Sequence, residues 1–163
     1  MNDDSALRLE RFALAAREFC RWAASPIDSS EQAATVVAQL VAELVAAGCA
    51  LGWTEGEPAE YDTSQVELDA VRLKSSALPF RYYSEVFNNL IVPPEAPVVG
   101  DIVDDLVDIY GDISPGLRLF DAGEKLAARN HWQFWLSNHW GEHATSALRA
   151  LWSYLAGREG SGL

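Results

Sequence analysis

The sequence has few basic residues and no long apolar run without polar interruption. Twelve Lys and Arg stand against 24 Asp and Glu, so the formal net charge is −12 at pH 7. A chain this acidic repels phosphate backbones and anionic headgroups. The most apolar segment, residues 33–51, contains Gln39 and Glu43, which argues against a membrane span. We therefore expect no nucleic-acid partner and no membrane association.

Cysteines and several common motifs are also scarce. Two cysteines, Cys20 and Cys49, are too few for a disulfide framework, and each lies in an apolar segment, so we expect two inert core thiols. The N-terminus is acidic and lacks the apolar stretch of a secretory signal, which predicts a cytoplasmic protein. The sequence contains no glycine-rich phosphate loop, no paired-cysteine metal motif and no Gly-x-Ser-x-Gly elbow, so it lacks the marks of several enzyme classes.

What the sequence does have is helical periodicity, with no alternation typical of a strand. Its 163 residues fit one domain, with ends at 1–4 and 157–163 expected to fray. We predict an all-α single-domain bundle of five to seven helices. The second helix is apolar over most of its circumference, so it should be mostly buried and central. The predicted segments are helices over 5–24, 30–47, 64–80 and 80–89, an extended connector over 90–100, an acidic helix over 99–113 and a long last helix over 123–155.

The start of the third helix carries a clear signal. Ser64 and Glu67 form a capping box, in which each residue satisfies a free backbone N–H of the other. Val66, Ala70 and Leu73 follow at helical spacing and predict the apolar face of this helix.

An acidic stripe runs along the segment 99–113. Read as a helix at about 100° per residue, it places four aspartates in an arc roughly 60° wide, with a fifth beside it. The five are Asp101, Asp104, Asp105, Asp108 and Asp112. Like charges one turn apart destabilise a helix by a few tenths of a kcal/mol per pair, so we expect other groups to neutralise the stripe. Ser114 and Pro115 follow, and they predict either a kink or a new helix.

The three histidines, His131, His139 and His143, all lie in the last predicted helix. His139 and His143 are one turn apart, so their rings should share a face. Three interpretations stay open. The imidazoles would pair with the aspartates in a structural network that includes arginine, with raised histidine pKa values. They would instead bind a divalent metal together with Asp105 and Asp108. In the third interpretation the two faces are unrelated and solvated.

Two short motifs bear on the metal interpretation. Residues 139–143 read H-x-x-E-H with Glu142, which resembles the inverted zinc-peptidase motif. Residues 104–108 read D-D-x-x-D, which resembles the magnesium-diphosphate motif of helical isoprenoid synthases. The chain is too short for the domains that surround these motifs, and a solvated acidic face is the alternative to both.

Four aromatic side chains are candidates for the lining of a ligand pocket. They are Tyr82, Tyr83, Trp132 and Trp135. Aromatic residues at helical spacing are more often part of a core, so the core remains the alternative.

Several segments in one order resemble a known family. They are Y-Y-S-E-V-F at 82–87, G-D-I-V-D-D-L-V-D-I-Y-G-D-I at 100–113, G-L at 116–117, W-Q-F-W at 132–135 and H-W-G-E-H-A-T-S-A-L-R-A-L at 139–151. Together they resemble the bacterial family named domain of unknown function 5063. The resemblance implies a small cytoplasmic bacterial protein, and it implies no established activity or catalytic residue.

Two functional hypotheses follow. The first, which we favour at this point, is a small binding or interaction module with an Asp/His polar cluster and a protein or small-molecule partner; a homo-oligomer is possible. The second is a metal-dependent hydrolase that uses the Asp stripe with His139 and His143 as ligands, and Glu142 or an aspartate as base.

Overall fold

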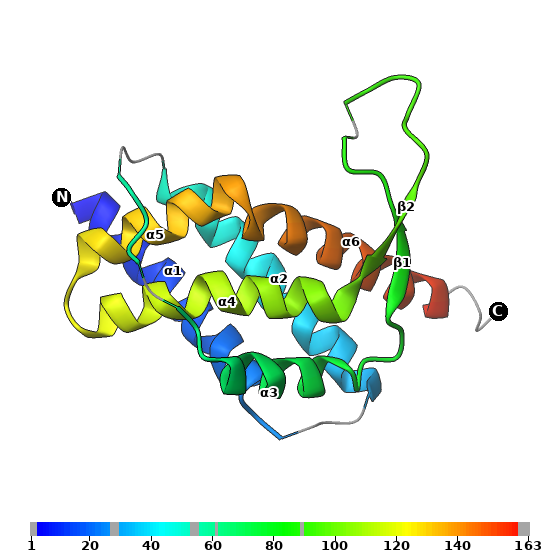
Figure 1. The fold of residues 1–163 in the computed structure, drawn as a ribbon, viewed down its shortest axis with the longest axis horizontal. Coiled ribbons are helices and arrows are strands. Elements are labelled where there is room, and N and C mark those ends of the chain that lie inside the picture. The colour runs from blue at the N-terminus through cyan, green and yellow to red at the C-terminus, as the bar shows by residue number, and fades with distance from the viewer. Residues whose placement is uncertain (1–2, 27–29, 53–55, 61, 89, 160–163) are drawn as a thin grey trace.

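The computed structural model describes residues 3–26, 30–52, 56–60, 62–88 and 90–159. This part of the chain forms a helical bundle with a small two-stranded antiparallel sheet, which confirms the predicted fold class (Figure 1). The helices are α1 (Asp3–Ala23), α2 (Ser30–Leu51), α3 (Gln65–Ser75), α4 (Ile102–Asp121), α5 (Lys125–Asn138) and α6 (Trp140–Glu159), and the strands are β1 (Tyr82–Glu85) and β2 (Val98–Asp101).

The centre of the bundle is α4, not α2 as expected. Helix α4 packs against α1, α3, α5 and α6, whereas α2 packs mainly on α1 and α6. The polar residues Gln39 and Glu43 of α2 face solvent as predicted, and its opposite face is buried. Helix α4 carries large branched side chains on several sides, so more than one neighbour can pack on it. Helix α2 is also the one described helix that is apolar and long enough to cross a membrane, a test that core helices pass as well.

Residues 80–89 were predicted to be helical, and this prediction is wrong. Tyr82–Glu85 is strand β1, which pairs with Val98–Asp101 in the register Tyr82↔Asp101 to Glu85↔Val98. Tyrosine and valine favour strands, but four residues are too few to display a visible alternation. Gly100 is required in this pair, because a Cβ there would lie 2.4 Å from the Tyr83 ring. The hairpin and its long loop, residues 82–101, project from the bundle, and we call this segment the arm (Figure 1).

Helix α4 runs without interruption through Pro115. Proline cannot donate to the carbonyl of Gly111, one turn earlier. That carbonyl accepts a hydrogen bond from Thr63 Oγ1 at 3.1 Å instead. The next two carbonyls also accept side-chain hydrogen bonds, from His131 Nε2 and Trp132 Nε1, each at 3.0 Å. These substitute partners explain why the helix neither ends nor restarts here.

The long last helix predicted over 123–155 is two helices, α5 and α6, which meet at His139. His139 has non-helical backbone angles, φ −155° and ψ −79°. Gly141 makes the junction possible, because a Cβ there would lie 2.1 Å from the carbonyl oxygen of Leu136. The turn at His139 thus sets the position of its own ring and of His143, which follows in α6.

Two smaller predictions also need correction. The capping box of Ser64 and Glu67 is present, but Val66 and Leu73 of the predicted apolar face are 79% and 65% exposed. Helix α3 instead turns Val71 and Lys74 inward, since the aliphatic part of a lysine packs well while its ammonium finds oxygen partners. Cys20 is a largely buried thiol whose pKa is raised by burial to about 12, but Cys49 is exposed and not a core thiol.

Candidate metal centre

The face of α4 between its first turn and its proline lies against the junction of α5 and α6. His143 Nδ1 lies 2.9 Å from Asp105 Oδ1, and His139 Nδ1 lies 2.8 Å from Asp112 Oδ2. The other nitrogen of His143, Nε2, lies 3.5 Å from Asp108 Oδ2. The structure therefore brings together three of the five predicted aspartates and two of the three histidines.

These contacts fix the proton on each ring. A carboxylate only accepts hydrogen bonds, so the Nδ1 atoms of His139 and His143 carry the hydrogen and donate it. In the neutral imidazole, Nε2 then keeps its lone pair. The hydrogen bond to Asp105 raises the pKa of His143 above its ordinary value, against the opposing effect of burial. Burial raises the pKa values of Asp108 and Asp112 despite the nearby imidazoles.

Asp108, His139 and His143 form a candidate metal-ligand set. One ligand atom from each of these three residues lies within 4.8 Å of the others. Tetrahedral ligands at about 2.1 Å from a zinc ion are about 3.4 Å apart, so Asp108 and His143 already have the separation of a bound pair. All three side chains are partly exposed, so a metal ion would reach them from solvent.

The remaining two aspartates of the stripe line the cavity beside His143 together with Asp105, but their ion-pair partners are arginines. Asp101 precedes α4 as its N-cap, accepts from the Val103 N–H and pairs with Arg81. Asp104 pairs with Arg72 of α3 at 3.0 Å. These two carboxylates are near the histidines but make no ion pair with them, because Asp104 faces Arg72 of α3 and Asp101 faces Arg81. Within the D-D-x-x-D pattern, Asp105 and Asp108 contact His143 and Asp104 does not.

Two residues of the arm contact this group of aspartates and histidines or lie next to it. Tyr83 donates its hydroxyl to Asp105 Oδ2 at 2.7 Å, so one carboxylate holds both Tyr83 and His143. Ser146 of α6 donates to the Glu85 carboxylate beside them. Sequence reasoning missed Glu85 and Ser146, because their contact depends on the hairpin; the alternation of Tyr83 and Glu85 on one face of β1 was the available signal.

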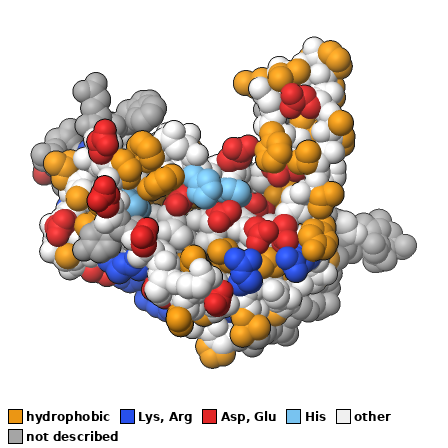
Figure 2. Space-filling view, viewed as in Figure 1, with side chains coloured by type: hydrophobic (Ala, Val, Ile, Leu, Met, Phe, Trp, Pro, Cys, Tyr) orange, Lys and Arg blue, Asp and Glu red, His pale blue; other side chains and the backbone are white. Residues whose placement is uncertain are grey.

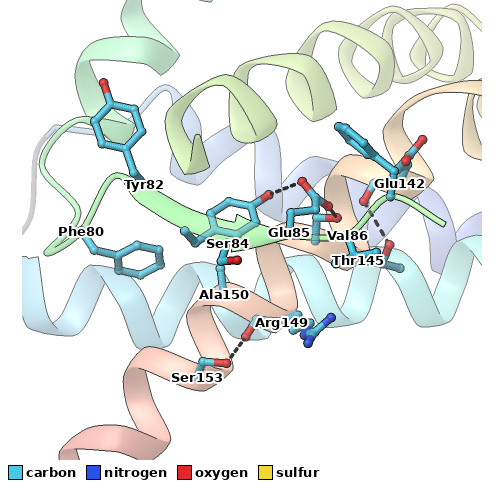
Figure 3. Close-up of a pocket in the computed structure, with 13 residues that line it drawn as sticks. Phe80, Tyr82, Ser84, Glu85, Val86, Glu142, Thr145, Arg149, Ala150 and Ser153 are labelled. Atoms are coloured by element: carbon cyan, nitrogen blue, oxygen red, sulfur yellow. Dashed lines mark hydrogen bonds between the residues drawn. The ribbon is translucent and has the colours of Figure 1, made fainter. Parts of the chain in front are cut away.

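The predicted pocket aromatics separate into two groups. Tyr82 and Tyr83 line a cavity between the arm and α6, drawn in Figure 3. Trp132 is a core residue with no exposed surface, so it does not line a pocket and the core alternative holds for it. Trp135 is partly buried, with its ring 6.1 Å from that of His139.

The third histidine, His131, supports the site from beneath. It is buried in α5, and its Nε2 donates to the carbonyl of Asp112, the residue whose carboxylate holds His139. Burial lowers the pKa of His131 below its ordinary value. His131 therefore positions Asp112 rather than contributing a ligand.

The histidines lie on the floor of a hollow between the arm and the opposite end of the bundle, with several carboxylates around them (Figure 2). Glu142 of the H-x-x-E-H pattern lines a cavity of about 280 Å³ beside His143. The fold and this face define the molecule as a helical protein with an Asp/His centre open to solvent.

Comparisons with known proteins identify the family and not the activity. Residues 5–157 match the family described as domain of unknown function (DUF5063), so the chain belongs to that family. The crystal structure of protein BF1032 from Bacteroides fragilis is similar in fold, with 20% identity and a TM-score of 0.69 over 91% of this chain and 90% of that chain. A search of the curated proteins finds no match.

Proposed function

We propose that this protein binds a divalent transition metal through Asp108, His139 and His143. The observation that carries the proposal is the orientation of the two imidazoles. Each donates Nδ1–H to a carboxylate, which leaves Nε2 as the nitrogen available to a metal. Metal-bound histidines usually donate their other ring N–H to a carboxylate, a backbone carbonyl or a water, which fixes the ring and raises its basicity.

The donor set indicates the kind of metal. Two imidazoles and one carboxylate suit zinc, iron(II), manganese(II) and related ions rather than calcium or magnesium, which prefer oxygen ligands. Three protein ligands leave at least one coordination position for water or a substrate, as in catalytic sites. The partial exposure of all three ligands is consistent with that open position.

If the centre is catalytic, the chemistry it supports best is hydrolysis. A bound divalent metal lowers the pKa of its water and polarises a carbonyl or phosphoryl oxygen. Glu142 lines the same cavity as His143 and is placed to accept a proton from such a water. The free state of both cysteines fits a cytoplasmic location, which remains part of the proposal.

An interaction module is the second candidate, and the arm supports it. Phe87, Leu90 and Val92 are 63%, 88% and 87% exposed. Apolar side chains gathered on a projecting segment are typical of protein–protein contacts. This role would be compatible with the metal centre, which lies at the base of the arm.

The experiment is a metal analysis of protein purified without chelator, followed by zinc titration of the chelator-treated protein. We expect about one metal ion per chain and a rise in Tm of several degrees at zinc concentrations 100 times Kd, since binding to the folded state alone then adds about 2.7 kcal/mol. The matched variants are Asp108→Asn, which removes a ligand, and Asp104→Asn, which removes a carboxylate one turn away.

Asp108→Asn should lose most of the zinc affinity, and Asp104→Asn should keep it. Equal zinc affinity in the two variants, or no rise in Tm for the wild type with zinc, iron(II) or manganese(II), would contradict the proposal.

A further inference from the structure

A cavity beside the proposed metal centre has the size of a small-molecule site. It has a volume of about 580 Å³ and lies between the arm and α6 (Figure 3). Ligand pockets are typically about 300–1,000 Å³, and the lining of this one mixes aromatic rings with carboxylate, hydroxyl and guanidinium groups. Phe80 and Tyr82 lie toward one end of this cavity, and Glu142 and Thr145 toward the other.

One wall of the cavity carries an arginine without a partner. Arg149 lines the cavity, and within the described residues its guanidinium makes no ion pair or hydrogen bond. Other arginines of this acidic chain, such as Arg17, Arg72 and Arg81, each bind a carboxylate. Arg149 is exposed to solvent at this wall, and a guanidinium without a carboxylate partner can bind an anionic group with two parallel hydrogen bonds.

The cavity adjoins the proposed metal centre. The smaller cavity beside His143 shares four lining residues with it, namely Glu85, Phe87, Glu142 and Ser146. The hydrogen bond from Ser146 to Glu85 lies at this boundary. Glu142 and Arg149 are seven residues apart on α6, or about 10 Å along the helix axis, so a ligand of ordinary metabolite size would reach from one to the other.

We infer that this cavity binds a small organic anion, a carboxylate or phosphate ester with an apolar body. Its charged group pairs with Arg149, its apolar part lies against Phe80 and Phe87, and its other end faces His143. The inference rests on the proposed metal centre for its chemistry, because that end of the ligand would meet the metal. Recognition of the anion itself depends on Arg149 and the cavity and not on the metal.

The test measures binding of three probes to the metal-free full-length protein by calorimetry or ligand-observed NMR. Phenyl phosphate and phenylacetate carry an anionic group on an aromatic body, and benzyl alcohol is the neutral counterpart. We expect at least one of the two anions to bind and benzyl alcohol not to bind measurably. The matched variants are Arg149→Gln and Arg11→Gln, because Arg11 is another arginine without an ion pair in the described residues and does not line the cavity.

Arg149→Gln should raise the Kd of the bound anion at least tenfold, and Arg11→Gln should leave it within twofold. Equal Kd values in the two variants, equal binding of benzyl alcohol, or no binding of either anion would overturn the inference. Zinc titration is measured separately on Asp108→Asn. A protein that binds zinc but neither anion therefore disproves the anion site alone, and one that binds an anion but no metal disproves the metal centre alone.

Discussion

The aspartates of the α4 segment form two groups with different partners. Asp101 and Asp104 pair with arginines, and the side chains of these two aspartates are 16% and 55% exposed. Asp105 and Asp112 pair with imidazoles, and their side chains are 8% and 14% exposed. The residue type is the same in both groups, so the packing partner decides what each carboxylate does.

The two kinds of partner differ in whether a nitrogen lone pair remains after the aspartate is bound. A guanidinium is permanently charged and has no lone pair, so an Asp–Arg pair is complete in itself. An imidazole that donates Nδ1–H to a carboxylate still presents Nε2. The arginine-paired aspartates therefore only neutralise charge, while the histidine-paired aspartates hold rings that can take a metal or a proton.

The largest expected contrast is in the stability of the metal-free protein. Asp105→Ala should lower the free energy of unfolding by about 2–3 kcal/mol, because it removes the acceptor of both Tyr83 and His143 from a buried position. Asp104→Ala should cost less than about 1 kcal/mol, since its ion pair is exposed. Urea unfolding in the presence of a chelator measures both, and a difference below 0.5 kcal/mol would remove the distinction between the two groups.

A second contrast concerns metal affinity. Asp112→Ala should weaken zinc binding by about 10–100-fold, because His139 would lose the carboxylate that orients its ring. Asp104→Ala should leave the affinity unchanged. Competition with a chromophoric chelator gives both values; an unchanged affinity in Asp112→Ala would show that this carboxylate does not support the site.

A third prediction concerns pH in the metal-free protein. The pKa of His143 is raised in the folded state, so its contribution to stability is fully present below the unfolded pKa near 6.5 and is lost as pH rises through the folded pKa. The pKa of His131 is lowered, so its contribution has the opposite sign and stability is lost as pH falls below about 6.5. NMR titration should find His143 above 6.5 and His131 below it. The reverse order would contradict the pairing.

The smallest expected effect is the coupling between Arg72 and Asp104. A double-mutant cycle to alanine should give at most about 0.5 kcal/mol, because both side chains are about half exposed and salt screens their attraction. A coupling above about 1.5 kcal/mol would mean that this exposed ion pair is as strong as the aspartate–histidine pairs.

The sequence predicted the helical bundle, because helices depend on local periodicity, and it offered the meeting of the acidic stripe with two histidines as one of three interpretations. The acidic stripe needed a neutralising face, and residues 139–143 offered one. Sequence reasoning did not predict the break at His139, which depends on the close approach of Gly141 to Leu136. A single straight helix over 123–155 therefore predicts the wrong directions for the side chains on one side of His139.

The arm and the proline could not be predicted for a related reason. Strands of four residues give little alternation, and they are stable here because β1 and β2 pair and Tyr83 packs over Gly100. Pro115 would interrupt an isolated helix, but Thr63, distant in sequence, supplies the hydrogen bond that proline cannot. In both cases the deciding partner lies far along the chain, where local patterns carry no information.

The most direct measurement is a crystal structure of the zinc-soaked protein with anomalous diffraction at the zinc edge. The account predicts one strong peak at about 2.0–2.2 Å from Nε2 of His139, Nε2 of His143 and a carboxylate oxygen of Asp108, with both Nδ1 atoms still bonded to Asp112 and Asp105. An absence of any peak between these residues, or a zinc ion bound through the Nδ1 atoms with the two carboxylates displaced, would contradict it.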